Sequence, residues 1–397
     1  MSGGPFAGVR IVDLTTMISG PIATRMLADQ GADVIKVEAP GTGDLTRQLG
    51  GRRGGISAVF ATSNRNKRSV VIDLKHPRGR EILDQLVTGA DAFVQNFRPG
   101  TALRMGIGET ALRQLRPDLV YVSICGFGET GPYAHKRVYD PVIQALSGLA
   151  HVQRDRTSGS NRPRMVRTIV PDKVTALTAA QAISAALFAR ERTGEGSHVR
   201  LAMLDAMVAF LWPEGMAGLT WRGEEATGSR YMLAQDLVFE TADGYLTTGA
   251  VSDAEWRGLV RVLQRPEWLE DPRFQTPGGR VAHAGERLAL TQEVLRTRPS
   301  AHWLERLDAE GVPCAPVLSV AEVPEHPQVV ANELIVESEH PAAGPMRQPR
   351  AAARFGAPAE EVLAPSPTLG EHTDEVLAEL GLGEAEIHEL RASGAVS

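Results

Sequence analysis

The carboxylate of Asp172 is the group in this sequence that is best placed to do chemistry. It follows Ile169, Val170 and Pro171, and after it small and apolar side chains recur at helical spacing up to Arg192. Asp172 therefore lies at the start of a long predicted helix. The start of a helix favours negative charge and offers free backbone N–H groups, so a carboxylate there could be a nucleophile. Alternatively, Asp172 only caps the helix, and the spacing alone favours that simpler role.

Strands and helices alternate in the sequence that precedes Asp172. Strands are predicted over 9–14, 33–38, 69–74, 92–97 and 119–124, and helices over 23–30, 77–88 and 140–149. Such alternation is typical of an open α/β fold with a parallel sheet. The turn after the first strand, TTMISGP, lacks the GxGxxG pattern, which disfavours a nicotinamide or flavin dinucleotide.

Three loops that carry glycine or polar residues follow predicted strands: ISGP, QNFRPG and CGFGETGPY. Because ligands of open α/β sheets bind at the carboxyl ends of the strands, we expect these loops to share one cleft. Basic residues without an evident acidic partner lie in the same part of the chain: Arg65, Lys67, Arg68, Lys75, Arg98, Arg104, Lys136 and Arg137. Each alone is typical of a solvated surface, but together they predict an anionic ligand such as a phosphate-bearing cofactor.

The pattern changes in the second half of the chain. Strands over 236–240 and 245–251 flank the turn ADG and predict a hairpin. Helices are expected over 254–264, 285–297 and 301–310, and a proline-interrupted edge strand over 312–320. These elements predict a compact α+β module. The proline-rich residues 323–367 are expected to form an extended traverse, and two short helices are expected to follow it. Asp253, Ser300 and Thr373 are the expected helix caps.

Composition excludes several classes of protein. The chain of 397 residues has 42 basic and 48 acidic residues, and its net charge of −6 is spread along the sequence, which argues against nucleic-acid binding. Two cysteines, Cys125 and Cys314, cannot form a disulfide framework. The sequence contains neither an apolar run long enough to span a membrane nor the pattern of a signal peptide, so we expect a cytoplasmic protein.

Taken together, these segments resemble the family III CoA-transferases of the CaiB/BaiF type. The resemblance rests on GVRIVDLTTMISGPIATRMLADQGADVIKVE, NKRSVVIDLK, NFRPG, RVYDPVIQALSGL, the Asp172 helix closed by RTGEG, and PTLGEHTDEVL. These motifs follow one another along nearly the whole chain. The sequence departs from the family's formyl-CoA member at Ala39 and Pro40, at Cys125, and around Gly228, where that member has a longer run of glycines.

The resemblance implies a two-domain fold and an interlocked homodimer. A large open, Rossmann-like α/β domain would be formed by residues 1–222 and 326–397, and a smaller α+β domain by residues 223–325. The proline-rich traverse would then return the chain to its first domain. Two such chains would interlock like links, each threading the ring of the other.

The resemblance also implies the site and replaces the capping role of Asp172 with a catalytic one. The residues that would contact CoA are Ile18, Ser19, Ile72, Lys75, Asn96, Phe97, Arg98, Arg104, Arg137, Val138, Tyr139 and Asp140. Arg104 and Arg137 would bind the phosphates or the pantetheine end of CoA. No metal and no permanently bound cofactor is implied, because coenzyme A or acyl-CoA is the substrate.

The implied reaction moves CoA from an acyl-CoA donor, with succinyl-CoA as a candidate, to a carboxylic acid. It would pass through a mixed anhydride and a CoA thioester of Asp172. The loop SGSNRPRMVR could hold a second substrate carboxylate through Arg162, Arg164 or Arg167, or it could be an ordinary surface loop.

Two alternative functions remain open at this point. A 2-methylacyl-CoA racemase of the same superfamily would need a histidine just before Asp140, where this chain has Tyr139. A non-catalytic acyl-CoA-binding protein would leave Asp172 without a task.

Overall fold

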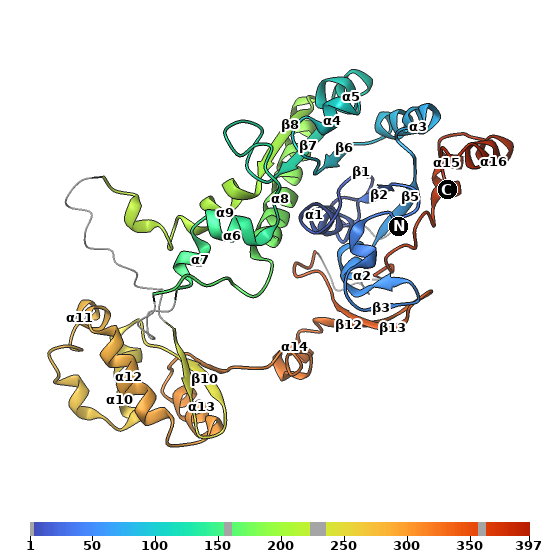
Figure 1. Ribbon diagram of the computed structural model, residues 1–397. Helices are drawn as coiled ribbons and strands as arrows, with labels where there is room; N and C mark the ends of the chain where they lie inside the picture. Colours follow the sequence, from blue (N-terminus) through green and yellow to red (C-terminus); the bar gives the residue numbers. More distant parts are fainter. Residues whose placement is uncertain (1–3, 155–160, 223–235, 356–362) are drawn as a thin grey trace. The chain divides into compact units, whose positions relative to one another are not determined.

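The chain folds into two compact units in the computed structural model, which describes residues 4–154, 161–222, 236–355 and 363–397 (Figure 1). Unit 1 comprises Met1–Trp212 and Glu333–Ser397, and unit 2 comprises Pro213–Asn332. Unit 1 is therefore built from both ends of the chain, and unit 2 from the part between them.

The described residues of unit 1 form a parallel sheet of six strands in the order β5-β2-β1-β6-β7-β8. The strands are β1 (Arg10–Asp13), β2 (Asp33–Glu38), β5 (Lys67–Val71), β6 (Ala92–Gln95), β7 (Val120–Cys125) and β8 (Ser197–Ala202). The chain starts at the centre with β1, moves outward through β2 and β5, and then returns to β6 on the other side of β1. The strand order reverses between β1 and β6, which is where open α/β sheets form ligand-binding crevices.

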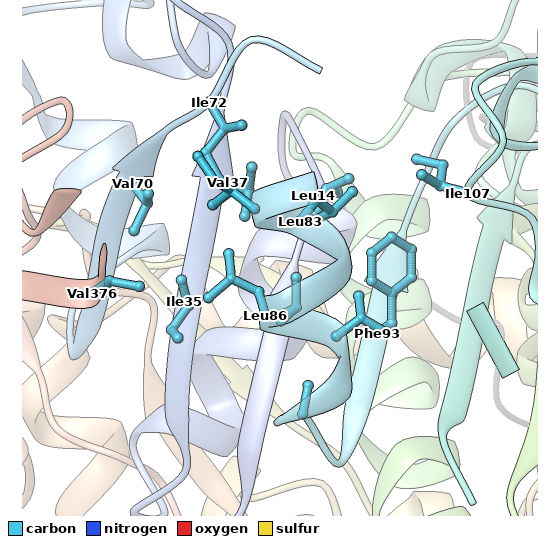
Figure 2. Packing of buried hydrophobic residues seen from close by; sticks show 14 of the residues in the cluster. Leu14, Ile35, Val37, Val70, Ile72, Leu83, Leu86, Phe93, Ile107 and Val376 are labelled. Carbon is cyan, nitrogen blue, oxygen red and sulfur yellow. The ribbon is translucent and has the colours of Figure 1, made fainter. Parts of the chain in front are cut away.

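Helices pack on both faces of this sheet because neighbouring residues of each strand point to opposite sides. On β1, Val12 packs into a core with α3 (Pro77–Thr88), α5 (Glu109–Leu115), α15 (Thr373–Glu379) and α16 (Glu384–Ala392). Ile11 points the other way, into a core with α1 (Ser19–Ala28) and α8 (Val170–Thr193). Figure 2 shows the first of these cores, with Leu83 and Leu86 of α3 lying over the strand residues Ile35, Val37 and Phe93.

Helix α8 has a small-residue face toward the sheet. Ala176, Ala179 and Ala180 are buried against α1 and the strands, and their size allows close packing. Its opposite side is apolar as well, because Leu177 is 58% exposed and Phe188 is 65% exposed. Helix α8 thus carries apolar side chains on a face that unit 1 itself leaves uncovered.

The end of the chain closes the edge of the sheet at β5. The hydroxyl of Thr373 accepts a hydrogen bond from the Val71 N–H at 3.2 Å, and the Ala395 carbonyl accepts one from the Asp73 N–H at 2.9 Å. Ile72 forms a β-bridge with Val396. Unpaired backbone groups of an edge strand otherwise invite association with other chains, so the tail protects this edge.

The proline-rich stretch 323–367, which begins at the end of unit 2 and continues into unit 1, is not simply extended, as its composition suggested. It contains α14 (Pro327–Ala331) and an antiparallel hairpin of β12 (Ile335–His340) and β13 (Gly344–Pro349). Proline sits only near the ends of these elements, where it removes no ladder hydrogen bond. The shorter elements of unit 1 are β3 (Arg52–Arg53), β4 (Ile56–Ser57), α2 (Ala58–Ser63), α4 (Thr101–Arg104), α6 (Asp140–Leu146), α7 (Leu149–Val152) and α9 (Met203–Leu211).

Unit 2 combines a small antiparallel sheet with helices. The sheet has the order β11-β10-β9, formed by β9 (Val238–Glu240), β10 (Tyr245–Thr248) and β11 (Cys314–Pro316). The main helices are α10 (Asp253–Leu263), α11 (Pro277–Ala282), α12 (Ala284–Leu295) and α13 (Ser300–Ala309). Trp256, Trp268 and Phe274 form the aromatic centre of its core.

The expected helix caps are wrong by one residue. Ser252, and not Asp253, caps α10, because Glu255 three residues later completes a reciprocal capping box with it. Ser300 and Thr373 are already inside their helices, and their hydroxyls bond elsewhere, to Thr241 and to Ser397. Within the part of the chain that the structure describes, no helix has the length and apolar character needed to cross a membrane.

Docking of the C-terminal residues on β5 should stabilise unit 1 measurably. Val396→Ala removes two methyl groups from a buried contact with the end of β5, so we expect the free energy of unfolding to fall by about 2 kcal/mol. Urea titration followed by circular dichroism measures this change. Val142→Ala, at a position that is 43% exposed, is the matched control and should stay within about 0.5 kcal/mol of the parent. Equal effects of both variants would contradict the docking argument.

Candidate active site

The Asp172 carboxylate lies between two helices of unit 1. It is the third residue of α8, and the N-cap residue Ile169 makes no side-chain capping bond. The carboxylate is partly buried against Ser19, the first residue of α1, whose backbone N–H and hydroxyl act on it as hydrogen-bond donors. The donors that stabilise its charge therefore belong to α1 and not to the first turn of α8, so Asp172 is not the cap of its own helix.

Asp140 is a second carboxylate beside Asp172. It is the first residue of α6 and is almost fully buried. Its Oδ2 accepts a hydrogen bond from the Asp172 backbone N–H at 3.3 Å. Burial, and next the negative charge of Asp140, raise the pKa of Asp172 to about 6, against the lowering effect of the Ser19 donors. Such a carboxylate is still ionised at neutral pH but is more basic than an ordinary one, as a nucleophile requires.

The loop after β1 delivers Ser19 to this position. Its backbone is constrained, since Met17 has a positive φ of 69° and a side chain at Gly20 would overlap Thr15. The side-chain amide of Asn96, directly after β6, holds the loop by two hydrogen bonds. It accepts one from the Thr16 N–H at 3.0 Å and donates one to the Thr16 carbonyl at 2.8 Å. Lys36 donates to the Thr15 carbonyl at 2.7 Å from β2.

A network of buried ion pairs lies beneath this loop. Lys67 contacts Asp13 at 2.9 Å, Lys36 contacts Asp44 at 3.0 Å, and Arg47 contacts Glu38 at 2.6 Å. Asp13 also accepts from the Thr15 N–H at 2.8 Å and from the Thr24 hydroxyl at 2.7 Å. Despite burial, Lys67 and Lys36 hold the pKa of Asp13 far below its ordinary value. These charges are satisfied within the protein, and they fix the start of the loop.

The network corrects the expectation that all the basic residues of this region face an anionic ligand. Lys67 is used by Asp13, Arg65 pairs with Asp29 at 2.8 Å, and Arg68 pairs with Asp33 at 2.7 Å. The expectation was wrong for these three residues because folding brings distant acids against them. Among the five remaining cations, Lys75 borders the pocket described next, and Arg98, Arg104, Lys136 and Arg137 have exposed side chains.

A pocket of about 200 Å³ opens at the carboxyl ends of β1, β2 and β5. Three of the residues carried over from the resemblance line it: Ile72, Lys75 and Phe97. Lys36 and Met105 lie in its wall as well. The pocket therefore lies at the carboxyl ends of the strands, where open α/β folds bind ligands.

The other residues carried over from the resemblance lie in three places. Ser19 and Asp140 adjoin Asp172, and Ile18 and Asn96 belong to the loop after β1 or its clasp. Arg98 and Arg104 follow β6, where Arg104 bonds to the Thr101 hydroxyl at 2.9 Å. Arg137, Val138 and Tyr139 precede α6, with Val138 packed against Gly126 and Tyr139 67% exposed. None of these last three is among the described residues that line the pocket.

Sequence reasoning missed the residues that support the loop. Lys36 and Glu38 are charged residues inside a predicted strand of a parallel sheet, and strands of such sheets are covered on both faces, so that pattern is a usable signal for a buried ionic network. Gln144, which bonds to Asp140 at 2.6 Å, gave no such signal. The departure around Gly228 and residues 158–160 of the arginine-rich loop lie outside the described residues.

Unit 2 holds a larger cavity, of about 470 Å³, lined mostly by apolar residues together with Arg280, Arg287 and Cys314. Burial, and then a hydrogen bond to Asp308, raise the pKa of the Cys314 thiol to about 11, so it is a poor nucleophile. None of the described residues that line this cavity is a carboxylate. Nor do the described residues gather three or more metal-binding side chains anywhere. The chemistry of a reactive acid therefore points to unit 1.

The chain is similar to known proteins along nearly its whole length. The profile of CoA-transferase family III matches residues 6–373. The mouse protein named succinyl-CoA:glutarate CoA-transferase is 35% identical over 399 residues, covering 99% of this chain and 90% of that protein. Formyl-CoA:oxalate CoA-transferase of Streptomyces coelicolor is 35% identical over 419 residues, covering all of both chains. The crystal structure of a CaiB/BaiF family protein from Brucella suis superposes with a TM-score of 0.80 at 32% identity, covering 96% of this chain and 100% of that one.

The raised pKa of Asp172 predicts a pH-dependent cost to stability. In the folded protein this carboxyl ionises near pH 6 instead of at its ordinary 3.8. The free energy of unfolding therefore falls as the pH rises from about 4 to 6. Asp172→Asn should therefore be more stable than the parent by a margin that grows as the pH rises from about 4 to 7. The margin is at most about 3 kcal/mol, because one pKa unit equals about 1.4 kcal/mol and solvent screens this partly exposed group.

Thermal and urea unfolding at several pH values measure this margin. Asp44→Asn is the matched control, since Lys36 lowers the pKa of Asp44 in spite of burial. Because the pKa of Asp44 is lowered, the destabilisation by Asp44→Asn should grow with rising pH only below about pH 4 and stay constant from about pH 4 to 7, where the margin of Asp172→Asn grows. A margin for Asp172→Asn that does not change with pH would contradict the raised pKa.

The buried ion pair beneath the loop predicts a second effect. Lys67→Met leaves the Asp13 charge buried with one partner fewer, so the free energy of unfolding should fall by about 3–5 kcal/mol. Arg78→Met, at an exposed pair with Glu81, should leave the free energy of unfolding almost unchanged. Urea titration of both variants tests the difference, and a Lys67→Met cost as small as the control would remove the pair as the support of the loop.

Proposed function

The chain belongs to CoA-transferase family III, and from that premise we propose that Asp172 is the nucleophile through which it moves CoA from an acyl-CoA donor to a carboxylic acid. The observation that carries this proposal is the Asp172 carboxylate itself, partly buried at the start of α8, held by Ser19 and raised in pKa by its surroundings. The racemase alternative lacks its histidine, since Tyr139 precedes Asp140.

The proposed reaction proceeds by two exchanges at the Asp172 carboxyl. One carboxylate oxygen attacks the carbonyl carbon of the donor thioester, the C–S bond breaks, and a mixed anhydride and CoA thiolate result. The thiolate then attacks the Asp172 carbonyl, which expels the donor acid and leaves an aspartyl-CoA thioester. The acceptor carboxylate repeats these steps in reverse. Both intermediates, the mixed anhydride and the aspartyl-CoA thioester, stay activated, so no ATP is consumed, but water must be excluded from the anhydride.

The charge of Asp140 favours the formation of these intermediates. While Asp172 is ionised, two negative charges lie close together and repel each other. Acylation converts Asp172 into a neutral anhydride or thioester and relieves this repulsion. The repulsion thus raises the energy of the free carboxylate relative to both covalent intermediates, which is the direction catalysis needs.

We assign the binding of CoA to the pocket at the ends of β1, β2 and β5 and to the residues beside it. Ile72, Lys75 and Phe97 line that pocket. The exposed guanidinium groups of Arg98, Arg104 and Arg137 supply the positive charge that the phosphates of CoA require. Ile18, Ser19, Asn96, Val138, Tyr139 and Asp140 complete the proposed set.

The acceptor is proposed to be a dicarboxylic acid and the donor succinyl-CoA. The relatives reported above are named for glutarate and for oxalate as acceptors, and the mouse protein is named for succinyl-CoA. A second carboxylate needs a cation near the nucleophile. Arg162, Arg164 and Arg167 lie in the exposed segment that leads into α8 and are candidates for that role.

We also propose that the protein works as an interlocked homodimer. The apolar face of α8 with Leu177 and Phe188, and Phe210 on α9, are exposed within a single chain. Large apolar side chains exposed on two helices that pack together favour a covering partner. A second copy of the chain would cover these side chains.

Trapping of the covalent intermediate tests the nucleophile. With succinyl-CoA present, hydroxylamine should convert Asp172 to a hydroxamate that mass spectrometry locates, because the activated aspartyl carbonyl reacts with amines. Without donor, no label is expected. Asp172→Asn should lose transfer activity by at least about a thousandfold, since no other group then carries the acyl transfer.

Controls separate this reading from its alternatives. Glu214→Gln, at an exposed carboxylate, should be labelled and active like the parent. Binding of CoA to Asp172→Asn, measured by calorimetry, should stay within threefold of the parent. Label on Asp140 or Glu214 would move the nucleophile, and exchange of the α-proton of a 2-methylacyl-CoA with no label would indicate a racemase. Binding without either reaction would indicate a non-catalytic acyl-CoA-binding protein.

A further inference from the structure

We propose that Gln144 is a positioning residue for the nucleophile: it holds Asp140 and the segment that leads into α8, and so sets where the Asp172 carboxylate lies relative to Asp140. The inference rests on the proposed function, because this geometry matters for catalysis only if Asp172 is the residue that reacts. Gln144 is not among the residues that the resemblance assigned to the site.

Gln144 is a buried polar side chain that uses both ends of its amide. It lies one turn after Asp140 on α6 and is 2% exposed. Its Nε2 donates to Asp140 Oδ1 at 2.6 Å and lies 3.2 Å from the Val166 carbonyl. Its Oε1 accepts from the Val166 N–H at 2.9 Å. Because both the Nε2 and the Oε1 of Gln144 are hydrogen-bonded in the interior, the side chain fixes the orientation of Asp140 and Val166.

The segment that Gln144 holds has no regular structure of its own. Residues 161–169 form neither helix nor strand, although they lead directly into α8. The amide of Gln144 contacts this segment at the Val166 N–H and carbonyl and at the Thr168 carbonyl, 3.3 Å away. These contacts take the place of a strand ladder, and they end only four residues before Asp172.

Gln144 also orients Asp140 toward Asp172. The two oxygens of Asp140 divide their bonds, Oδ1 to the Gln144 amide and Oδ2 to the Asp172 backbone N–H. A carboxylate held at one oxygen cannot rotate freely, so the other oxygen stays at the start of α8. Gln144 therefore acts on Asp172 by two routes, the backbone segment and the Asp140 carboxylate.

Few charged groups of the neighbouring elements face this pair. From α6 the charge that acts on Asp172 is Asp140, and α1 presents the uncharged Ser19. On α8 itself, Lys173 is turned to the Thr168 hydroxyl at 2.9 Å. Helix α9 also packs here and carries Asp205 in its first turn, whose charge acts on the Cys125 thiol. A change at Gln144 should therefore be felt mainly through Asp140.

Two variants of Gln144 should move the pH profile of kcat/KM in opposite directions. Gln144→Met removes the clamp, so Asp140 turns away, its repulsion weakens, the pKa of Asp172 falls, and the acidic limb shifts to lower pH. Gln144→Glu keeps the oxygen that Val166 needs but places another carboxylate beside Asp140, so the acidic limb shifts to higher pH. We expect shifts of about one pH unit and a tenfold to hundredfold fall in kcat, with KM for the acyl-CoA changed less than threefold.

A matched control and a double variant separate positioning from general damage. Gln348→Met replaces another buried glutamine of unit 1, on β13, and should leave the pH limb and kcat unchanged. In an Asp140→Asn background, Gln144→Met should no longer shift the limb, because the charge it acts through is gone. Shifts of equal sign in the two Gln144 variants, or a loss of activity with an unmoved limb, would overturn the proposal.

A readout without substrate keeps this proposal distinct from the proposed function. The pH at which Asp172→Asn gains its stability margin should move in the Gln144→Met background to lower pH, and no movement would contradict the positioning role. Hydroxylamine labelling of the parent protein tests the nucleophile separately. Label on Asp172 with unmoved pH limbs in the Gln144 variants would leave the proposed function standing and reject Gln144. Absence of label on Asp172 would reject the nucleophile itself.

Discussion

Charged side chains that are buried beneath the loop after β1 constrain the rest of unit 1. Asp13, Lys36 and Lys67 lie in a region without solvent, where an unpaired charge is prohibitively costly. Each of these charges must therefore keep its hydrogen-bonding partners. Two of those partners are backbone groups of Thr15: its N–H bonds to Asp13 and its carbonyl to Lys36. The loop cannot shift without breaking a buried charge contact. Since the same loop ends at Ser19, the position of the donors to Asp172 follows from the network.

Two aspartates of unit 1 show how one residue type acquires two roles. Asp13 is surrounded by lysines and hydroxyls, which keep it ionised at any physiological pH in spite of burial. Asp172 is partly buried beside another acid, and the donors of Ser19 offset these effects only in part, so its negative charge is weakly stabilised. The first environment makes a permanent structural anion. The second makes a carboxylate whose charge is easily exchanged for a covalent bond.

Local patterns predicted the elements of the sheet well. The partners of the basic residues were not predicted, because they are distant in the sequence. The strand over 33–38 and the helix over 77–88 have the predicted bounds, because the order of apolar residues decides them locally. The partners of Arg68 were invisible in the sequence, since Glu379 lies 311 residues away. Caps were misplaced by one residue, because the hydroxyls of Ser300 and Thr373 were claimed by tertiary contacts. The roles of Asp172 and of the residues assigned to CoA came from resemblance and stay predictions, and Gln144 had no local signature at all.

The attachment of the C-terminal residues to β5 has a consequence for synthesis of the chain. A ribosome makes β1, β2 and β5 early, but the N–H groups of Val71 and Asp73 bond to Thr373 and Ala395, and the Val71 carbonyl bonds to Ser397. All of unit 2 is made in between. The nascent chain must therefore carry an open sheet edge until residues 373–397 have been made, and pairing of that edge with another chain is the hazard. This edge of unit 1 is completed only after Ala395, Val396 and Ser397 have left the ribosome.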